Sequence, residues 1–155
     1  MEKIKIREMK PEDYIGVRTV DELTQRQYLG SLWDQLSEAE KQAHLQSRQS
    51  EFGLNLQTGY CFVGITNETM VGFVLAHETL PFRDRVYIRH IAIHPDYQGA
   101  GIGSLLYKAV IKKARQSGIE KITALINLDN QNSMKLHKKM GFELIDRKEA
   151  ILSLR

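Results

Sequence analysis

Short stretches in which apolar and polar residues alternate, or in which β-branched residues run together, recur between turn-forming residues along the chain. Such stretches predict β-strands, because successive side chains of a strand point to opposite faces of a sheet. They cover residues 4–7, 60–66, 70–77, 85–93, 121–128, 142–147 and 150–154. We therefore expect a sheet of about six to seven strands.

Apolar residues at helical spacing predict about four helices between these strands. The clearest helix covers residues 101–117, whose apolar positions fall on one face, and Gly118 follows as its C-terminal cap. The helices are expected to begin near Pro11, at the capping box 37–40, at Gly101, and at Asp129 or Asn130. The order of elements predicts a mixed α/β (α+β) fold, and we expect a single domain over residues 1–155 because no linker or repeat interrupts it.

Composition narrows the class of protein without identifying it. The chain has 155 residues, of which 42% are apolar and 26% charged, as in an ordinary soluble domain. A net charge of +3 is too small to indicate nucleic acid as a partner. The single cysteine, Cys61, excludes an internal disulfide, and no stretch approaches the roughly 20 apolar residues of a membrane span. We therefore expect a cytoplasmic protein that binds neither membrane nor nucleic acid.

A glycine-rich loop, Gln98-Gly99-Ala100-Gly101-Ile102-Gly103, follows a predicted strand and opens a predicted helix. Such a junction presents several backbone N–H groups at the positive end of a helix dipole, which indicates a phosphate site. A Walker loop is excluded because no lysine follows the glycines. A dinucleotide-binding domain stays open as an alternative, although only about a third of the chain follows the loop.

The loop and its flanks resemble those of the GNAT superfamily, the acyl-CoA-dependent N-acyltransferases. The loop fits the family motif Gln/Arg-x-x-Gly-x-Gly/Ala, and the segment 91–97 leads into it as in that family. Downstream, Asn130-x-x-Ser133-x-x-Leu136-His137-Lys138-Lys139-Met140-Gly141-Phe142 resembles the signature of the family's last helix. The resemblance covers roughly the C-terminal half of the chain, and the first half carries no specific motif.

The resemblance implies that acetyl-CoA is the co-substrate and that the acceptor is an amine of a small molecule or a protein. It also implies that the fourth and fifth strands splay apart, so that the pantetheine arm pairs with the backbone near Ile91 and Ile93. The pyrophosphate would lie on the N–H groups of the loop, where glycine lets the backbone approach closely. The implied cofactor-binding residues are Ile91, Ala92, Ile93, Gln98, Gly99, Ala100, Gly101, Ile102, Gly103, Ser104, Asn130, Ser133 and His137.

Acetyl transfer to an amine requires a base, because a protonated amine cannot attack. Many family members carry a Glu in the middle of the fourth strand for this purpose, whereas this chain has Arg89, which cannot accept a proton, and His90. Alternation places His90 with Val86, Ile88 and Ala92, opposite Arg89 and Ile91. His77 and Glu78, at the end of the third strand, are the other candidates, and of these His77 is expected to be an ordinary surface histidine.

The leaving thiolate is protonated in many family members by a Tyr in the last helix, where this chain has His137. Either His137 donates that proton, or it is a polar residue without a proton role and the thiolate leaves into water. The candidate catalytic residues are thus His137, His90 and Glu78.

Metal chemistry is not expected. His90 and His94 would lie about 13 Å apart on a strand, and no His or Cys cluster has ligand spacing. Cys61 falls in a strand pattern and is expected in the core. A catalytically weak or inert acyl-CoA-binding sensor on the same fold is the alternative function, and a homodimer stays open.

Overall fold

The computed structural model describes residues 2–81 and 83–154, and its internal contacts divide them into two units. The first unit runs up to Leu125 and the second begins at Ile126. The strands are β1 (Lys5–Glu8), β2 (Phe62–Thr66), β3 (Thr69–Glu78), β4 (Arg85–Ile93) and β5 (Lys121–Ala124). The α-helices are α1 (Tyr14–Leu29), α2 (Ser31–Gln35), α3 (Glu38–His44), α4 (Gln49–Leu56), α5 (Ile102–Gln116) and α6 (Gln131–Lys139), with short 3-10 turns η1 (Pro11–Asp13) and η2 (Pro95–Tyr97).

The first unit is built on one sheet with the strand order β1-β2-β3-β4-β5. Consecutive strands from β1 to β4 pair antiparallel, and β4 pairs with β5 in parallel, since α5 provides the crossover between them. The mixed α/β fold expected from the sequence is thereby confirmed.

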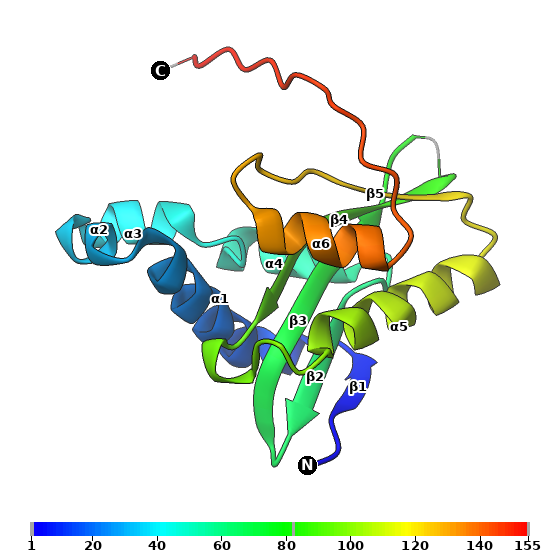
Figure 1. Cartoon of the computed structure of the whole chain (residues 1–155), viewed down its shortest axis with the longest axis horizontal. Coiled ribbons are helices and arrows are strands. Elements are labelled where there is room, and N and C mark those ends of the chain that lie inside the picture. Colours follow the sequence, from blue (N-terminus) through cyan, green and yellow to red (C-terminus); the bar gives the residue numbers. More distant parts are fainter. Residues whose placement is uncertain (1, 82, 155) are drawn as a thin grey trace. The chain divides into compact units, whose positions relative to one another are not determined.

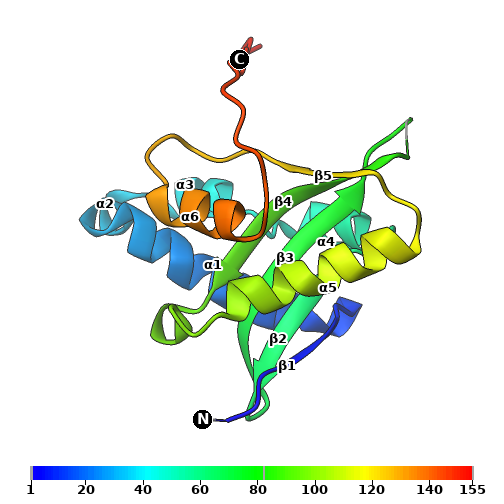
Figure 2. The ribbon, with the colours of Figure 1, turned by 45° about the vertical axis from the view of Figure 1, so that its right-hand side comes forward.

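Helices cover both faces of this sheet (Figure 1). Helices α1 and α4 pack on one face, which we call the α1–α4 face, and α5 packs on the opposite one, the α5 face (Figure 2). The core of the α1–α4 face consists of Met9, Val17, Val20, Phe52, Cys61, Val63, Phe73, Leu75 and Ala92. On the α5 face, Ile102 packs against the sheet at Gly64 and Gly72.

The segment between α1 and β2 contains more helices than the single one expected there. The predicted capping box is present, because the Ser37 hydroxyl accepts from the Glu40 N–H and the Glu40 carboxylate accepts from the Ser37 N–H. That helix, α3, nevertheless ends at His44, and α4 begins afresh at Gln49. The expected helix is therefore broken where the buried Ser47 bonds to α1 through Asp21.

The last third of the chain contains less strand than expected. The strand predicted over residues 121–128 ends at Ala124, because its ladder with β4 ends there. Residues 142–147 and 150–154 were also expected as strands and have no regular secondary structure. An alternating pattern becomes a strand only where a neighbouring strand supplies hydrogen bonds, and none pairs with these residues within 2–81 and 83–154.

Candidate functional site

The glycine loop, residues 98–104, joins β4 through η2 to the first turn of α5 (Figure 2). Both Gly99 and Gly101 have φ of +80°, a backbone conformation that other residues adopt only under strain. A Cβ at either position would meet nothing within 4 Å. Glycine is therefore required there for backbone conformation and not for lack of space.

Six consecutive backbone N–H groups, from residue 99 to residue 104, donate to no other group in the part of the chain that the structure describes. The intrahelical ladder of α5 begins only with the Leu105 N–H, which donates to the Gly101 carbonyl. These N–H groups lie at the positive end of a 15-residue helix, where an anion is stabilised. The loop thus has the donors and the field that a phosphate group requires.

The β4–β5 ladder stops at the pair Ile88–Ala124, although β4 continues to Ile93. The His94 N–H donates to the Val71 carbonyl oxygen of β3, so alternation turns the N–H groups of Ile91 and Ile93 toward the opposite edge, where β5 no longer pairs. This is the backbone edge that the resemblance assigned to the pantetheine arm.

The Gln98 side chain connects the glycine loop to two elements. Its amide nitrogen donates to the Ile93 carbonyl oxygen at 3.1 Å and to Gln27 Oε1 on α1 at 2.9 Å. Since both bonds use the side chain, Gln98 positions the loop, and its side-chain donors are already occupied.

A β-bulge corrects the expected orientation of β4. Leu75 pairs with His90 and Ala76 with Ile88, so Arg89 is an extra residue without a partner on β3. Beyond the bulge His90 lies with Ala92 on the α1–α4 face, whereas Val86 and Ile88 share the α5 face with Ile91. The prediction that placed His90 with Val86 and Ile88 is therefore wrong, because strict alternation does not hold across an inserted residue.

His90 faces a buried carboxylate on α1. Its Nε2 lies 3.8 Å from Oδ1 of Asp21, and both atoms are buried without a hydrogen-bond partner among the described residues. The other oxygen of Asp21 accepts from the Ser47 N–H at 2.8 Å and from its hydroxyl at 2.7 Å. Burial lowers the pKa of His90, the Asp21 charge raises it in part, and Arg89 lowers it. The imidazole is therefore neutral near pH 7 and can accept a proton.

Glu78, the other candidate base, lies elsewhere on the sheet. It pairs with Val86, which in turn pairs with Ile122 of β5, at the closed end of the β4–β5 ladder. Val86 and Ile91 are five residues apart on β4, which corresponds to about 17 Å. The geometry favours His90 over Glu78, because only His90 lies where β4 has no β5 partner.

Cys61 belongs to the core of the α1–α4 face, as expected. Burial raises the pKa of its thiol to about 11, and the thiol donates to the Asn55 carbonyl oxygen. It is thus not a thiolate nucleophile at neutral pH.

The second unit contains the remaining predicted residues. Asn130 caps α6, since its side-chain oxygen accepts from the Ser133 N–H at 3.1 Å. The His137 Nδ1 lies 2.7 Å from the Ser133 carbonyl oxygen, which can only accept, so Nδ1 carries a proton that it donates there. Burial lowers the pKa of His137, and the bond to Ser133 raises it in part. A neutral ring whose proton is held by a carbonyl is a poor proton donor, which disfavours the acid role predicted for His137.

Asp21 and Ser47 are residues of this site that sequence reasoning missed. The signal for Asp21 was present in the sequence, because Asp21 follows Tyr14 and Val17 at helical spacing and so falls on the apolar side of α1. A carboxylate on an apolar stripe is costly unless it has partners. Ser47 had no such signal, because it lies between two helices that the sequence pattern merged.

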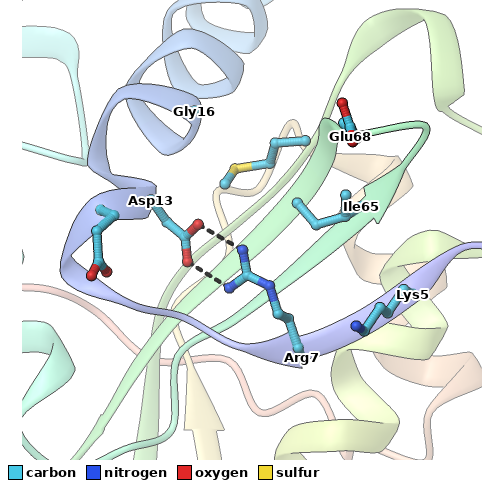
Figure 3. A pocket seen from close by; sticks show the side chains of 8 residues that line it. Lys5, Arg7, Asp13, Gly16, Ile65 and Glu68 are labelled. Carbon is cyan, nitrogen blue, oxygen red and sulfur yellow. Dashed lines mark hydrogen bonds and ion pairs between the residues drawn. The ribbon is translucent and has the colours of Figure 1, made fainter.

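A pocket of about 390 Å³ lies at the β1 side of the sheet, and no residue of the glycine loop lines it (Figure 3). Arg7 and Asp13 face each other across it in a bidentate ion pair with two distances of 2.8 Å. Its lining residues are Lys5, Arg7, Glu12, Asp13, Gly16, Ile65, Glu68 and Met70. Since Arg7 of β1 and Asp13 of η1 are paired with each other, we interpret it as the anchor of η1 on β1.

No helix within the described residues is both long and apolar enough to cross a bilayer. No cluster of three or more His, Cys, Asp and Glu side chains gathers there as a metal-ligand set.

Comparison with known proteins bears on this geometry. The model of the acetyltransferase (GNAT) family matches residues 19–142. The chain is 32% identical over 123 residues to a ribosomal protein bS18-alanine N-acetyltransferase of Haemophilus influenzae, covering 74% of this chain and 77% of that protein. It is 29% identical over 104 residues to an L-methionine sulfoximine/L-methionine sulfone acetyltransferase of Pseudomonas aeruginosa, covering 64% of this chain and 60% of that protein.

Solved structures show the same fold. An aminoglycoside N-acetyltransferase in complex with CoA superposes with a TM-score of 0.71 at 21% identity, covering all of this chain and 97% of that one. The ribosomal-protein-S18-alanine N-acetyltransferase of Escherichia coli superposes with a TM-score of 0.70 at 18% identity, covering 93% of this chain and 80% of that one.

Proposed function

We propose, from the premise that the chain belongs to the acetyltransferase (GNAT) family, that this N-acetyltransferase transfers an acetyl group from acetyl-CoA to a primary amine by direct attack within a ternary complex. The observation that carries the proposal is the row of six N–H groups at residues 99–104 that have no acceptor among the described residues, beside a β4 edge that β5 leaves unpaired. A diphosphate and an extended amide-bearing arm are the ligand groups that would satisfy both.

The fit of CoA to this site rests on backbone groups. The N–H groups of Gly99 to Ser104 would hold the pyrophosphate, and the outward main chain of Ile91 and Ile93 would hold the arm. One acceptor on this edge is already in use, because the Ile93 carbonyl oxygen accepts from Gln98. In the second unit, we propose Asn130 and Ser133 as further cofactor-binding residues, and the Asn130 side chain also caps α6.

Bound acetyl-CoA supplies a thioester carbonyl that an unprotonated amine can attack. The residue we assign to deprotonation of that amine is His90, because it is neutral, partly exposed and next to the unpaired stretch of β4. The Ile91 N–H is the donor we assign to the oxyanion that forms at the carbonyl. We assign no acid to the leaving thiolate, which takes its proton from water.

The acceptor class is an amine, and the relatives' acceptors include the alanine of a ribosomal protein and an amino-acid analogue. We therefore expect an α-amine to be among the acceptors. A panel that separates the classes contains a peptide beginning with Ala, free amino acids, a polyamine and an aminoglycoside.

Two measurements test this function. Calorimetry should detect binding of CoA and acetyl-CoA and none of NADH, and thiol release from acetyl-CoA should depend on an amine from the panel. Binding of NADH without binding of CoA would overturn the assignment of the cofactor. Binding of acetyl-CoA with no amine-dependent release would instead indicate an acyl-CoA sensor and would overturn the assignment as an enzyme.

A further inference from the structure

Asp21 is a fully buried carboxylate in the middle of α1, between the apolar residues of the α1–α4 face. Burying a carboxylate is costly unless hydrogen bonds and opposite charges compensate it. Only one of its oxygens is compensated, by the N–H and the hydroxyl of the buried Ser47. These bonds fix the segment between α3 and α4 to α1, and they leave the second oxygen, Oδ1, unexplained.

The feature that Oδ1 faces is the ring of His90. The distance from Oδ1 to Nε2 is 3.8 Å, longer than a hydrogen bond but within ion-pair range. Both atoms are buried and have no hydrogen-bond partner among the described residues. A small movement that brings them into hydrogen-bond contact satisfies an acceptor and a donor at once, provided that Nε2 carries the proton.

The other charged side chains near His90 form ion pairs with one another. Arg89, adjacent on β4, donates from Nη2 to Oε2 of Glu51 on α4 at 2.7 Å. Arg48 lies 3.8 Å from the same carboxylate of Glu51. The positive charge of Arg89 therefore has its counter-ion on α4, and Asp21 on α1 is the carboxylate that faces His90.

The imidazole is oriented so that one nitrogen is buried and another part of the ring is exposed. The His90 side chain is 23% exposed, whereas its Nε2 is not exposed at all. When Nε2 holds the proton toward Asp21, the lone pair of a neutral imidazole is on Nδ1. The base is then Nδ1, the nitrogen that does not face Asp21.

We propose that Asp21, itself held by Ser47, is a positioning residue that fixes His90 in the tautomer with the proton on Nε2, so that Nδ1 takes the proton of the acceptor amine. The proposal rests on the proposed function. In the step, the amine nitrogen forms a bond to the acetyl carbon, the bond from that carbon to sulfur breaks, and the amine proton passes to Nδ1. The resulting imidazolium is stabilised by the Asp21 carboxylate until it releases the proton to water, while the thiolate takes a proton from water.

The test compares two variants with the wild-type protein in amine-dependent CoA release. Asp21→Asn keeps the size of the side chain and an oxygen for Ser47, but it turns an N–H group toward Nε2 and so favours the opposite tautomer. We expect kcat to fall roughly 10²-fold with KM for acetyl-CoA changed less than about 3-fold. The acidic limb of kcat/KM should also move to lower pH, because the carboxylate that raises the pKa of His90 is gone. Glu22→Gln, which removes the neighbouring exposed carboxylate of α1, should leave both quantities unchanged.

Nitrogen NMR of the wild-type protein supplies a readout that needs no variant and no folding control. A protonated Nε2 and an unprotonated Nδ1 at His90 support the proposal, and the reverse tautomer overturns it. An Asp21→Asn protein that melts as the wild type does and keeps kcat and its pH limb also overturns it. The proposed function fails separately, when the wild-type protein releases no CoA with any amine of the panel.

Discussion

The two faces of the sheet differ in the kind of group that each provides. On the α5 face the important positions are glycines: Gly64 and Gly72 lie under Ile102, and Gly99 and Gly101 shape the loop above them. On the α1–α4 face the important groups are polar side chains, above all the buried Asp21 and the partly exposed His90 that faces it.

The difference shows which changes each face tolerates. A backbone site depends on φ angles and on close packing, and is sensitive to added atoms. A side-chain site depends on charges and tautomers, and is sensitive to isosteric exchange of one polar group for another. We therefore expect substitutions on the α5 face to change cofactor affinity, and substitutions on the α1–α4 face to change turnover and stability.

The largest effect is expected for His90→Gln. Loss of the base should lower kcat by about 10²- to 10³-fold and leave the Kd of acetyl-CoA unchanged. In the wild-type protein the base is active when neutral, and burial lowers its pKa from the ordinary 6.5. The rate should therefore rise with pH through a limb below pH 6.5 and be level above it, as a pH profile of kcat/KM would show.

Two neighbours are the controls for that substitution. His77→Gln alters another histidine of the same face, which contacts Tyr87 at the closed end of the sheet, and Glu78→Gln removes the other candidate base. Both should change kcat less than about 3-fold. A larger loss of kcat in Glu78→Gln than in His90→Gln would identify Glu78, and not His90, as the base.

The next effect is expected for Gly101→Val. A β-branched residue at φ of +80° is strained by roughly 1–3 kcal/mol, so the loop relaxes away from the conformation that aligns its N–H groups. The Kd of CoA, measured by calorimetry, should rise about 10- to 100-fold, with kcat at saturating acetyl-CoA nearly unchanged.

Gly118→Val is the matched control, because Gly118 follows the other end of α5 with φ of +72° and also has open space around it. It should lower the melting temperature by a similar amount and leave the Kd of CoA unchanged. Equal Kd values of CoA for the Gly101→Val and wild-type proteins would show that the glycine loop does not bind the cofactor.

A smaller effect is expected for Gly72→Ala. The added Cβ would lie 2.9 Å from Cδ1 of Ile93, 3.1 Å from Cγ2 of Ile102 and 3.2 Å from the Ala92 carbonyl oxygen. The first turn of α5 must shift, and we expect the Kd of CoA to rise about 3- to 10-fold. Gly64→Ala is a graded control on β2, where the nearest atoms are at 3.3 and 3.4 Å, and it should have less effect in the same titration.

The smallest effect concerns Asp13, which forms the ion pair with Arg7 (Figure 3). Arg7 in turn pairs on the sheet with the core residue Val63. The hydrogen bonds from Arg7 lower the pKa of Asp13. The stabilisation is therefore complete above the ordinary pKa of an Asp and is lost as pH falls through the lowered value.

Asp13→Asn should thus lower the free energy of unfolding by about 1 kcal/mol at pH 7, in urea titrations. The difference from the wild type should disappear in strong acid, and Glu12→Gln in the same turn should show none. A catalytic loss in Asp13→Asn without loss of stability would contradict its role as an anchor.

Much of the first unit could be predicted from the sequence. The strands at β2, β3 and β4, the helix α5 and the capping box of α3 follow from periodicity and capping, which act over a few residues. The Gly99 and Gly101 conformations follow in the same way, because a left-handed backbone selects glycine locally.

The parts that could not be predicted depend on contacts between distant residues. The bulge at Arg89 cannot be predicted from the sequence, because it is a property of the β3–β4 register. It places His90 on the face opposite to Val86 and Ile88, where strict alternation would place all three on one face. The end of β5 and the absence of strands at 142–147 and 150–154 depend on which partner strands are present.

The sequence by itself determined the mixed α/β order and the family, and it predicted a phosphate site at the glycine loop, since each depends on residues that are consecutive in the chain. Only the tertiary structure decided that Asp21, Ser47 and His90 come together, although they lie 26 and 43 residues apart along the chain. The physical reason is that side-chain chemistry depends on what a fold places within a few ångströms, and a one-residue change of register reverses the face that a strand residue occupies.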